Sequence, residues 1–196
     1  MRFLRSKLAS GALAVTSFGR DRRGVSAIEF AMVVPILLLL YVGVAETGNA
    51  LTIYRRTSTV ASTAADLTAQ VKQVSASDLK DIESASSGIL TPYSTSPLKI
   101  VLSSVVADQN NNGKVDWSCA NKGSGRGKDT PYTVPPGLTE PNSSVIVAEV
   151  TYDFAPLLNL TQVFSPGSFQ MTRTFYARPR RSLTVKKTDE GCQSTS

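Results

Sequence analysis

The stretch RDRRGVSAIEFAMVVPILLLLYVGVAE, residues 20–46, decides how this chain is built, because an apolar run follows directly after a cluster of basic side chains. Residues 30–45 are uncharged, and the apolar run extends back to Val25 if the acid Glu29 is tolerated. That is about 20 residues, close to the length that an α-helix needs to cross the ~30 Å hydrocarbon core of a bilayer. The sequence therefore predicts one membrane-spanning helix.

The net charge of +6 is concentrated at the N-terminus of the 196-residue chain. Residues 1–24 hold six basic side chains and one acid, a net of +5, which leaves +1 for the remainder. Basic residues ahead of an apolar run keep the N-terminus in the cytoplasm, so we expect the C-terminal bulk on the other side of the membrane. The nearly neutral remainder lacks the clustered Lys and Arg that face phosphates, and we expect no nucleic-acid partner.

The side chains available for chemistry are few. The sequence has no histidine, which excludes Ser-His-Asp and Cys-His catalysis and histidine metal sites. We also find no phosphate-binding loop and no nucleophile with a nearby base, so we expect no enzyme activity and no cofactor. Cys119 and Cys192 form no CxxC pair, which argues against a metal site. Both cysteines would lie outside the membrane, where a disulfide persists, so we expect a bridge between them, with two free thiols as the alternative.

Glu29 distinguishes three fates of the apolar segment: an uncleaved anchor, a secretory signal cut after Ala45, or a leader that ends at Gly24. A carboxylate inside a spanning helix costs roughly 2.5–3.5 kcal/mol, so it usually has a partner or a function. Cleavage after Gly24 would give Val25 a free amine one helical turn from Glu29, the fifth residue of the mature chain. In an assembled fibre, Glu29 could pair instead with the amine of a neighbouring subunit. In the simplest interpretation, Glu29 merely lies at the membrane interface.

The segment RRGVSAIEF, residues 22–30, resembles the processing site of type IV prepilins. The match is closest to the TadE/TadG-like minor pilins of the tight-adherence (Flp, or Tad) pilus, whose motif reads RRGxxAxEFAxxxP. That motif corresponds here to Arg22, Arg23, Gly24, Ala27, Glu29, Phe30, Ala31 and Pro35. The resemblance implies cleavage after Gly24 by a membrane-embedded aspartic prepilin peptidase. It assigns Gly24, Val25, Glu29 and Phe30 to the processing site, and Val25 and Glu29 to a charge pair used in assembly.

Three later segments are also similar to this family: VDWS at 115–118, VAEVTYDFAPL at 147–157 and TFYARPR at 174–180. The resemblance implies a minor pilin or pseudopilin-like, single-pass component of Flp (Tad) pilus assembly in the bacterial inner membrane. Its N-terminus would be cytoplasmic, its C-terminal domain periplasmic or external, and its partners the prepilin peptidase, other pilin subunits, the Tad machinery and the lipid bilayer. The alternative is a secreted or bitopic module that binds a ligand or calcium outside the cytoplasmic membrane.

The resemblance implies a leader at residues 1–24. The apolar run and the pattern after it divide the rest into a transmembrane segment (25–46), an extramembrane half of the long helix (47–74) and an extracytoplasmic α+β domain (75–196). The apolar residues beyond the membrane recur at helical spacing, which predicts one helix from Val25 to about Gln73. This stripe consists of Val60, Ala64, Leu67, Val71 and Val74. A second helix is expected at residues 78–86, with Ser77 as its N-cap.

The remaining pattern predicts about four antiparallel strands. Residues 98–120 are typical of a hairpin with an Asn-Gly turn, and residues 143–154 and 169–179 alternate as strands do. Asp108, Asn110, Asn112, Gly113 and Asp116 have the spacing of a calcium loop, but Cys119 stands where the bidentate Glu is required. The basic run RPRR at 178–181 is explained by a solvated strand end, or by contact with lipid headgroups or an acidic subunit. The predicted fold class is α+β and pilin-like, a long N-terminal transmembrane helix packed on a small antiparallel sheet.

Overall fold

The computed structural model describes residues 23–156, 169–189 and 191–192, and the chain divides into two compact units, residues 1–47 and 48–196. Its longest element is helix α2 (Arg23–Ala69), whose 47 residues begin in the first unit and end in the second. Pro35 lies inside this helix, a position that spanning helices tolerate because neighbouring groups satisfy the freed carbonyl. The helix is long and apolar enough to cross a membrane, as the sequence predicts.

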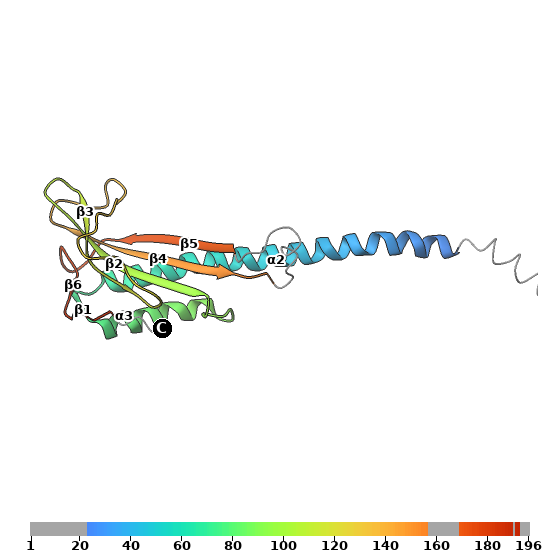
Figure 1. Cartoon of the computed structure of the whole chain (residues 1–196), viewed down its shortest axis with the longest axis horizontal. Helices are drawn as coiled ribbons and strands as arrows, with labels where there is room; N and C mark the ends of the chain where they lie inside the picture. The colour runs from blue at the N-terminus through green and yellow to red at the C-terminus, as the bar shows by residue number, and fades with distance from the viewer. Residues whose placement is uncertain (1–22, 157–168, 190, 193–196) are drawn as a thin grey trace, which may run out of the picture. The chain divides into compact units, whose positions relative to one another are not determined.

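In the second unit a four-stranded antiparallel sheet forms the main layer, which confirms the predicted fold class (Figure 1). The strand order is β3 (Gly113–Ala120), β2 (Leu98–Ala107), β4 (Ser144–Phe154) and β5 (Phe169–Ala177). The register places Leu102 of β2 opposite Ala148 of β4. Because side chains alternate across a strand, these two residues share the sheet face that packs in the main core.

Residues 48–69 of α2 cover this face through small side chains. The buried positions are Ile53, Thr57, Val60, Ala61, Ala64, Ala65, Thr68 and Ala69. The expected stripe is therefore only partly correct, since Leu67 and Val71 are half-buried. Thr57 and Thr68 are buried at no hydrogen-bonding cost, because each hydroxyl donates to the carbonyl four residues earlier at 2.8 Å.

The prediction that α2 runs to Gln73 is wrong, since the helix ends at Ala69. The Arg180 N–H donates to the Ala69 carbonyl at 2.9 Å, and the Arg180 guanidinium pairs with Asp66 one turn earlier. This distant segment satisfies a carbonyl that every helix end leaves unpaired. The chain then forms β1 (Gln73–Val74), which pairs in parallel with β6 (Lys186–Lys187), a small sheet that the sequence pattern did not predict.

The second helix is confirmed, but it starts earlier than predicted. Helix α3 (Ala76–Ser87) has Ser75 as its N-cap, whereas Ser77 was expected. The Ser75 hydroxyl accepts the Asp78 N–H, and the Asp78 carboxylate accepts the Ser75 N–H, a capping box that satisfies two exposed donors. These bonds hold the pKa of Asp78 below its usual range. The 3₁₀ turn η1 (Gly88–Leu90) follows the helix.

The predicted hairpin is confirmed by the pairing of β2 with β3. In its turn, the Asp108 carboxylate accepts the N–H groups of Asn112 at 2.8 Å and Asn110 at 2.9 Å. These bonds lower the pKa of Asp108. The carboxylate that would begin a calcium loop thus holds the turn, and the described residues contain no group of three His, Cys, Asp or Glu placed to hold a metal.

Candidate processing and assembly site

The residues predicted for processing lie at the start of α2. Gly24, Val25, Glu29 and Phe30 all belong to the helix and all are exposed. The exposure continues along the apolar segment as far as residue 45, apart from two half-buried valines. No described residue therefore covers most of this apolar surface, as expected of a segment that contacts lipid or other helices.

Glu29 and Val25 share one face of α2, because side chains four positions apart lie one turn above the other. Four residues of helix span about 6 Å at ~1.5 Å per residue. Among the described residues no salt bridge involves Glu29. An exposed carboxylate on an apolar helix surface is suited to pairing with a positive group brought by another molecule or by cleavage of the chain.

Gly24 is sterically free. A Cβ added at this glycine would meet nothing within 4 Å, and the same holds for Gly43 farther along the helix. Gly24 therefore has no packing role in the described structure that would explain why it is a glycine.

Two threonine hydroxyls near residue 48, where the two units meet in the sequence, are hydrogen-bonded within the helix itself. The Thr47 hydroxyl donates to the Gly43 carbonyl at 2.7 Å, and the Thr52 hydroxyl donates to the Gly48 carbonyl at 2.8 Å. Hydroxyls bonded in this way do not need water. This end of the apolar segment is thus compatible with the edge of a membrane.

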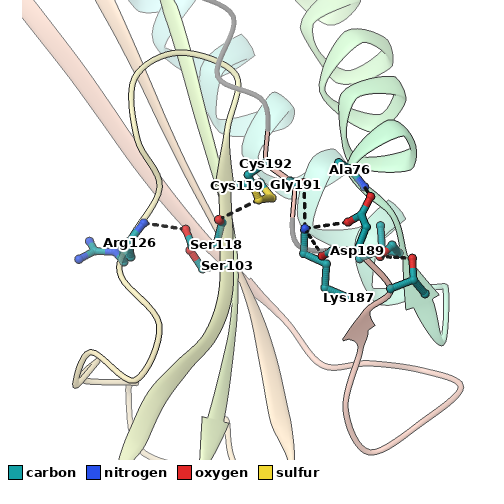
Figure 2. Close-up of a disulfide and its surroundings, with 11 residues drawn as sticks. Ala76, Ser103, Ser118, Cys119, Arg126, Lys187, Asp189, Gly191 and Cys192 are labelled. Atoms are coloured by element: carbon teal, nitrogen blue, oxygen red, sulfur yellow. Dashed lines mark hydrogen bonds and ion pairs between the residues drawn. A yellow bond between two sulfur atoms is a disulfide. The ribbon is translucent and has the colours of Figure 1, made fainter.

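In the second unit the expected disulfide is present. Cys119 of β3 is bonded to Cys192, with their Cα atoms 5.2 Å apart and a sequence separation of 73. Figure 2 shows this bridge beside the segment where Lys187 and Asp189 approach the first turn of α3 at Ala76. The Asp189 carboxylate pairs with Lys187 at 2.7 Å and accepts the Ala76 N–H at 2.9 Å, and these two contacts lower the pKa of Asp189.

The arginines of the C-terminal basic run are partly used inside the fold. Arg178 donates to the carbonyls of Leu138 at 2.9 Å and Gly137 at 2.5 Å, and Arg180 pairs with Asp66. Arg181 is exposed and makes no such bond to the part of the chain that the structure describes. The interpretation as a merely solvated strand end is therefore too simple, because two of these arginines join separate segments of the domain.

One feature that the sequence reading missed is a groove of about 750 Å³ between α3 and the ends of β2 and β3. The residues that line it include Cys119, Cys192 and Glu83, which is only 8% exposed. A signal for it existed in the sequence. Glu83 follows the buried Leu79 by four positions, so an amphipathic reading of α3 places this acid on the inward face.

Burial rather than charge pairing controls the Glu83 carboxyl group. Desolvation raises its pKa to about 7, and its Oε1 atom has no hydrogen-bond partner among the described residues. Uncompensated burial of an ionisable group costs free energy, so such a group requires a specific explanation.

The family model described as TadE-like protein matches residues 24–66, a range that begins at Gly24 and covers Val25, Glu29 and Phe30. This finding confirms the resemblance drawn from the N-terminal motif. A search of curated proteins and a search of solved structures give no match.

Proposed function

We propose that this chain, which is TadE-like over residues 24–66, is a minor pilin of the Tad pilus system whose leader is removed by a prepilin peptidase after Gly24. The coarser part of this conclusion, a Tad pilus-associated and membrane-anchored component, follows from the family match and the long apolar helix. One observation supports the more specific claim, cleavage after Gly24. Gly24, Val25 and Glu29 stand exposed at the start of that helix, and the family match begins there.

Cleavage would change the electrostatics of the helix start. The new α-amino group of Val25, with an ordinary pKa of about 7.7–8.0, would be largely positive at neutral pH. Glu29 lies about 6 Å farther along the same face. In the membrane, where the dielectric constant is low, a carboxylate of one subunit beside the amine of another favours lateral packing of their helices. Each charge then offsets the free-energy cost of burying the other.

In this role the protein performs no chemistry of its own. The apolar helix anchors it in the inner membrane, with the N-terminus on the cytoplasmic side, and the domain that follows helps to initiate, cap or stabilise the fibre. The proposed partners are the peptidase, the other pilin subunits and the Tad machinery. The domain boundaries that accompany this proposal are a leader at 1–24, a membrane segment at 25–46 and external parts from residue 47 onward.

The experiment is to determine the mature N-terminus by mass spectrometry of membrane fractions. We expect wild-type protein to start at Val25 and the Gly24→Arg variant to remain uncut. Gly48→Arg is the matched control, since Gly48 lies on the same helix outside the membrane segment and neither glycine has an atom within 4 Å of its Cβ position. Glu29→Ala should be cleaved normally and yet fail to support pili, because it lacks the carboxylate and not the cleavage site.

Two outcomes would overturn the proposal. A wild-type chain that starts at Glu46 would mean secretion by an ordinary signal peptidase. A chain that retains its leader, with Gly24→Arg indistinguishable from wild type, would mean a simple anchored module in which Glu29 has no role in assembly.

A further inference from the structure

The two edges of the four-stranded sheet differ in whether the chain itself covers them. At the β3 edge, the Val115 N–H donates to the Thr130 carbonyl at 3.0 Å, and the Tyr132 N–H donates to the Gly113 carbonyl at 2.9 Å. These bonds satisfy backbone groups that an outermost strand leaves unpaired. The loop after β3 therefore closes this edge of the sheet.

The opposite edge, formed by β5, is open (Figure 1). The Asp153 N–H donates to the Pro97 carbonyl just before β2 at 3.2 Å, so odd-numbered residues of β4 bond to β2 and even-numbered ones to β5. The register pairs even-numbered residues of β4 with odd-numbered residues of β5. The residues of β5 whose backbone groups point outward are therefore Gln170, Thr172, Thr174 and Tyr176. No residue in the described part of the chain bonds to these outward groups.

Strand β5 also lacks the devices that usually protect an edge from pairing. Its nine residues contain no proline and no lysine, and their register with β4 has no bulge. Thr172 and Thr174 are exposed. A long, regular edge strand of this kind is a template for a further strand.

The side chains on the α2 side of this edge indicate what such a strand should carry. The Arg173 guanidinium carbon lies 3.8 Å from the centre of the Tyr54 ring, a stacking that occupies the flat face of the guanidinium and not its N–H edges. No salt bridge involves Arg173 among the described residues. Its Nε atom is buried without a partner, but the side chain as a whole is half-buried, so its two Nη atoms are the ones left for a carboxylate. Phe175 follows on the same side of the strand and is 41% exposed.

We propose that the outer edge of β5 binds an extended segment of a partner protein, which adds a fifth, antiparallel strand with a carboxylate opposite Arg173 and an apolar side chain opposite Phe175. Both residues would lie in pairs that exchange no backbone hydrogen bond, where the two Cα atoms are only ~4.5 Å apart and side chains interact closely. Backbone bonds would supply affinity, and the alternate side chains would supply specificity. This inference does not depend on the proposed processing, because β5 and Tyr54 lie within the second unit.

The test measures amide hydrogen exchange by NMR on the full chain in neutral detergent micelles. Without a partner, the amides of Thr172 and Thr174 should exchange rapidly, whereas those of Arg173 and Phe175 should be protected by their bonds to β4. The probe is the capped peptide TVTETVT, whose central glutamate would face Arg173 while its valines face the neighbouring positions of the same side. We expect this peptide to slow the exchange of Thr172 and Thr174 by at least about tenfold.

Matched peptides and variants separate the two parts of the recognition. The peptide TVTKTVT should bind at least about tenfold more weakly, because it lacks the charge-assisted bond. Arg173→Gln should weaken TVTETVT by a similar factor, while Arg181→Gln, a change at an exposed arginine outside the strand, should not. Thr174→Pro should abolish binding, since it removes an outward N–H. It should leave the Phe175 amide protected, because proline is tolerated on an edge strand where the N–H faces solvent.

Four results would overturn the proposal. Protection of Thr172 and Thr174 in the free chain would show that another segment of the chain covers the edge, or a second copy if that protection depends on concentration. Failure of TVTETVT to bind would show that the edge takes no strand of this chemistry. Equal binding of TVTETVT and TVTKTVT would remove the role of Arg173. Unchanged binding to Thr174→Pro would place the peptide elsewhere on the protein.

Discussion

Replacing Glu83 by Gln tests whether this acid is buried without compensation. Glutamine has nearly the same shape as the protonated carboxyl group, but it cannot ionise. In the native state burial raises the pKa of Glu83 from an ordinary 4.5 to about 7, whereas in the unfolded chain water solvates the carboxylate. Lys80, Lys122 and Asp189 also line the groove, but the dominant cause of the higher pKa is desolvation.

The expected magnitude follows from proton linkage. Between pH 4.5 and 7 the unfolded chain releases the Glu83 proton and the native chain retains it, so the free energy of unfolding falls as the pH rises through this window. At about 1.4 kcal/mol per pKa unit, the loss is about 3 kcal/mol and is complete above pH 7. Glu83→Gln lacks this loss. We therefore expect the variant to be more stable than wild type by up to about 3 kcal/mol at pH 8 and nearly equal to it at pH 4.

The assay is urea unfolding of the full chain in micelles at pH 4, 6 and 8, followed by tryptophan fluorescence. Trp117 is the single tryptophan, and its ring N–H donates to the Val185 carbonyl at 2.8 Å inside the core, so it reports on the second unit alone. Asp81→Asn serves as the exposed-acid control. A Glu83→Gln variant whose advantage over wild type is the same at pH 4 and pH 8 would refute the reasoning.

Two further substitutions test the packing of the domain by the same urea assay. Cys192→Ser should lower the free energy of unfolding by about 4 kcal/mol, because it opens the loop closed by the bridge to Cys119. Reductant should lower the free energy of unfolding of wild type by the same amount. An unchanged urea midpoint in both experiments would contradict this prediction. Gly113→Ala should cost about 1–3 kcal/mol because its Cβ would lie 2.5 Å from the Tyr132 carbonyl oxygen. Gly48→Ala should cost nothing, since its Cβ meets no atom within 4 Å; equal losses in the two alanine variants would show that close contact is not the cause.

Local patterns were sufficient to predict most elements of this fold. The apolar run, the alternation of β4 and the Asn-Gly turn of the hairpin each depend on neighbours within about ten residues, so a single sequence reveals them. The end of α2 depends on Arg180, which lies 114 positions from its ion-pair partner Asp66. The pairing of β1 with β6 likewise joins two-residue segments that are too short to show a period.

The N-terminal processing motif and the groove beside α3 also differ in how far apart their residues lie in the sequence. The N-terminal motif is contiguous, so the family resemblance and the exposed helix start could both be predicted from residues 22–30. The groove is assembled from α3, the hairpin and the C-terminal segment, and only Glu83 itself gave a local signal. The contacts of the loop after β3 could not be predicted from local sequence either. Arg126 forms a bidentate pair with Glu149 at 2.6 and 2.8 Å, and its guanidinium lies 4.9 Å from the centre of the Tyr132 ring.

The proposed cleavage and the folding of the second unit should be independent of each other. Along the described part of α2 no residue before Ile53 is buried, so removal of the leader after Gly24 takes no side chain out of the core. Gly24→Arg should therefore leave the free energy of unfolding, measured by Trp117 fluorescence in urea, within about 0.5 kcal/mol of wild type, as for surface changes generally. The same variant should abolish processing. A Gly24→Arg variant that is both uncut and clearly destabilised would instead make its uncut state a consequence of misfolding, and the glycine would lose its proposed role in peptidase recognition.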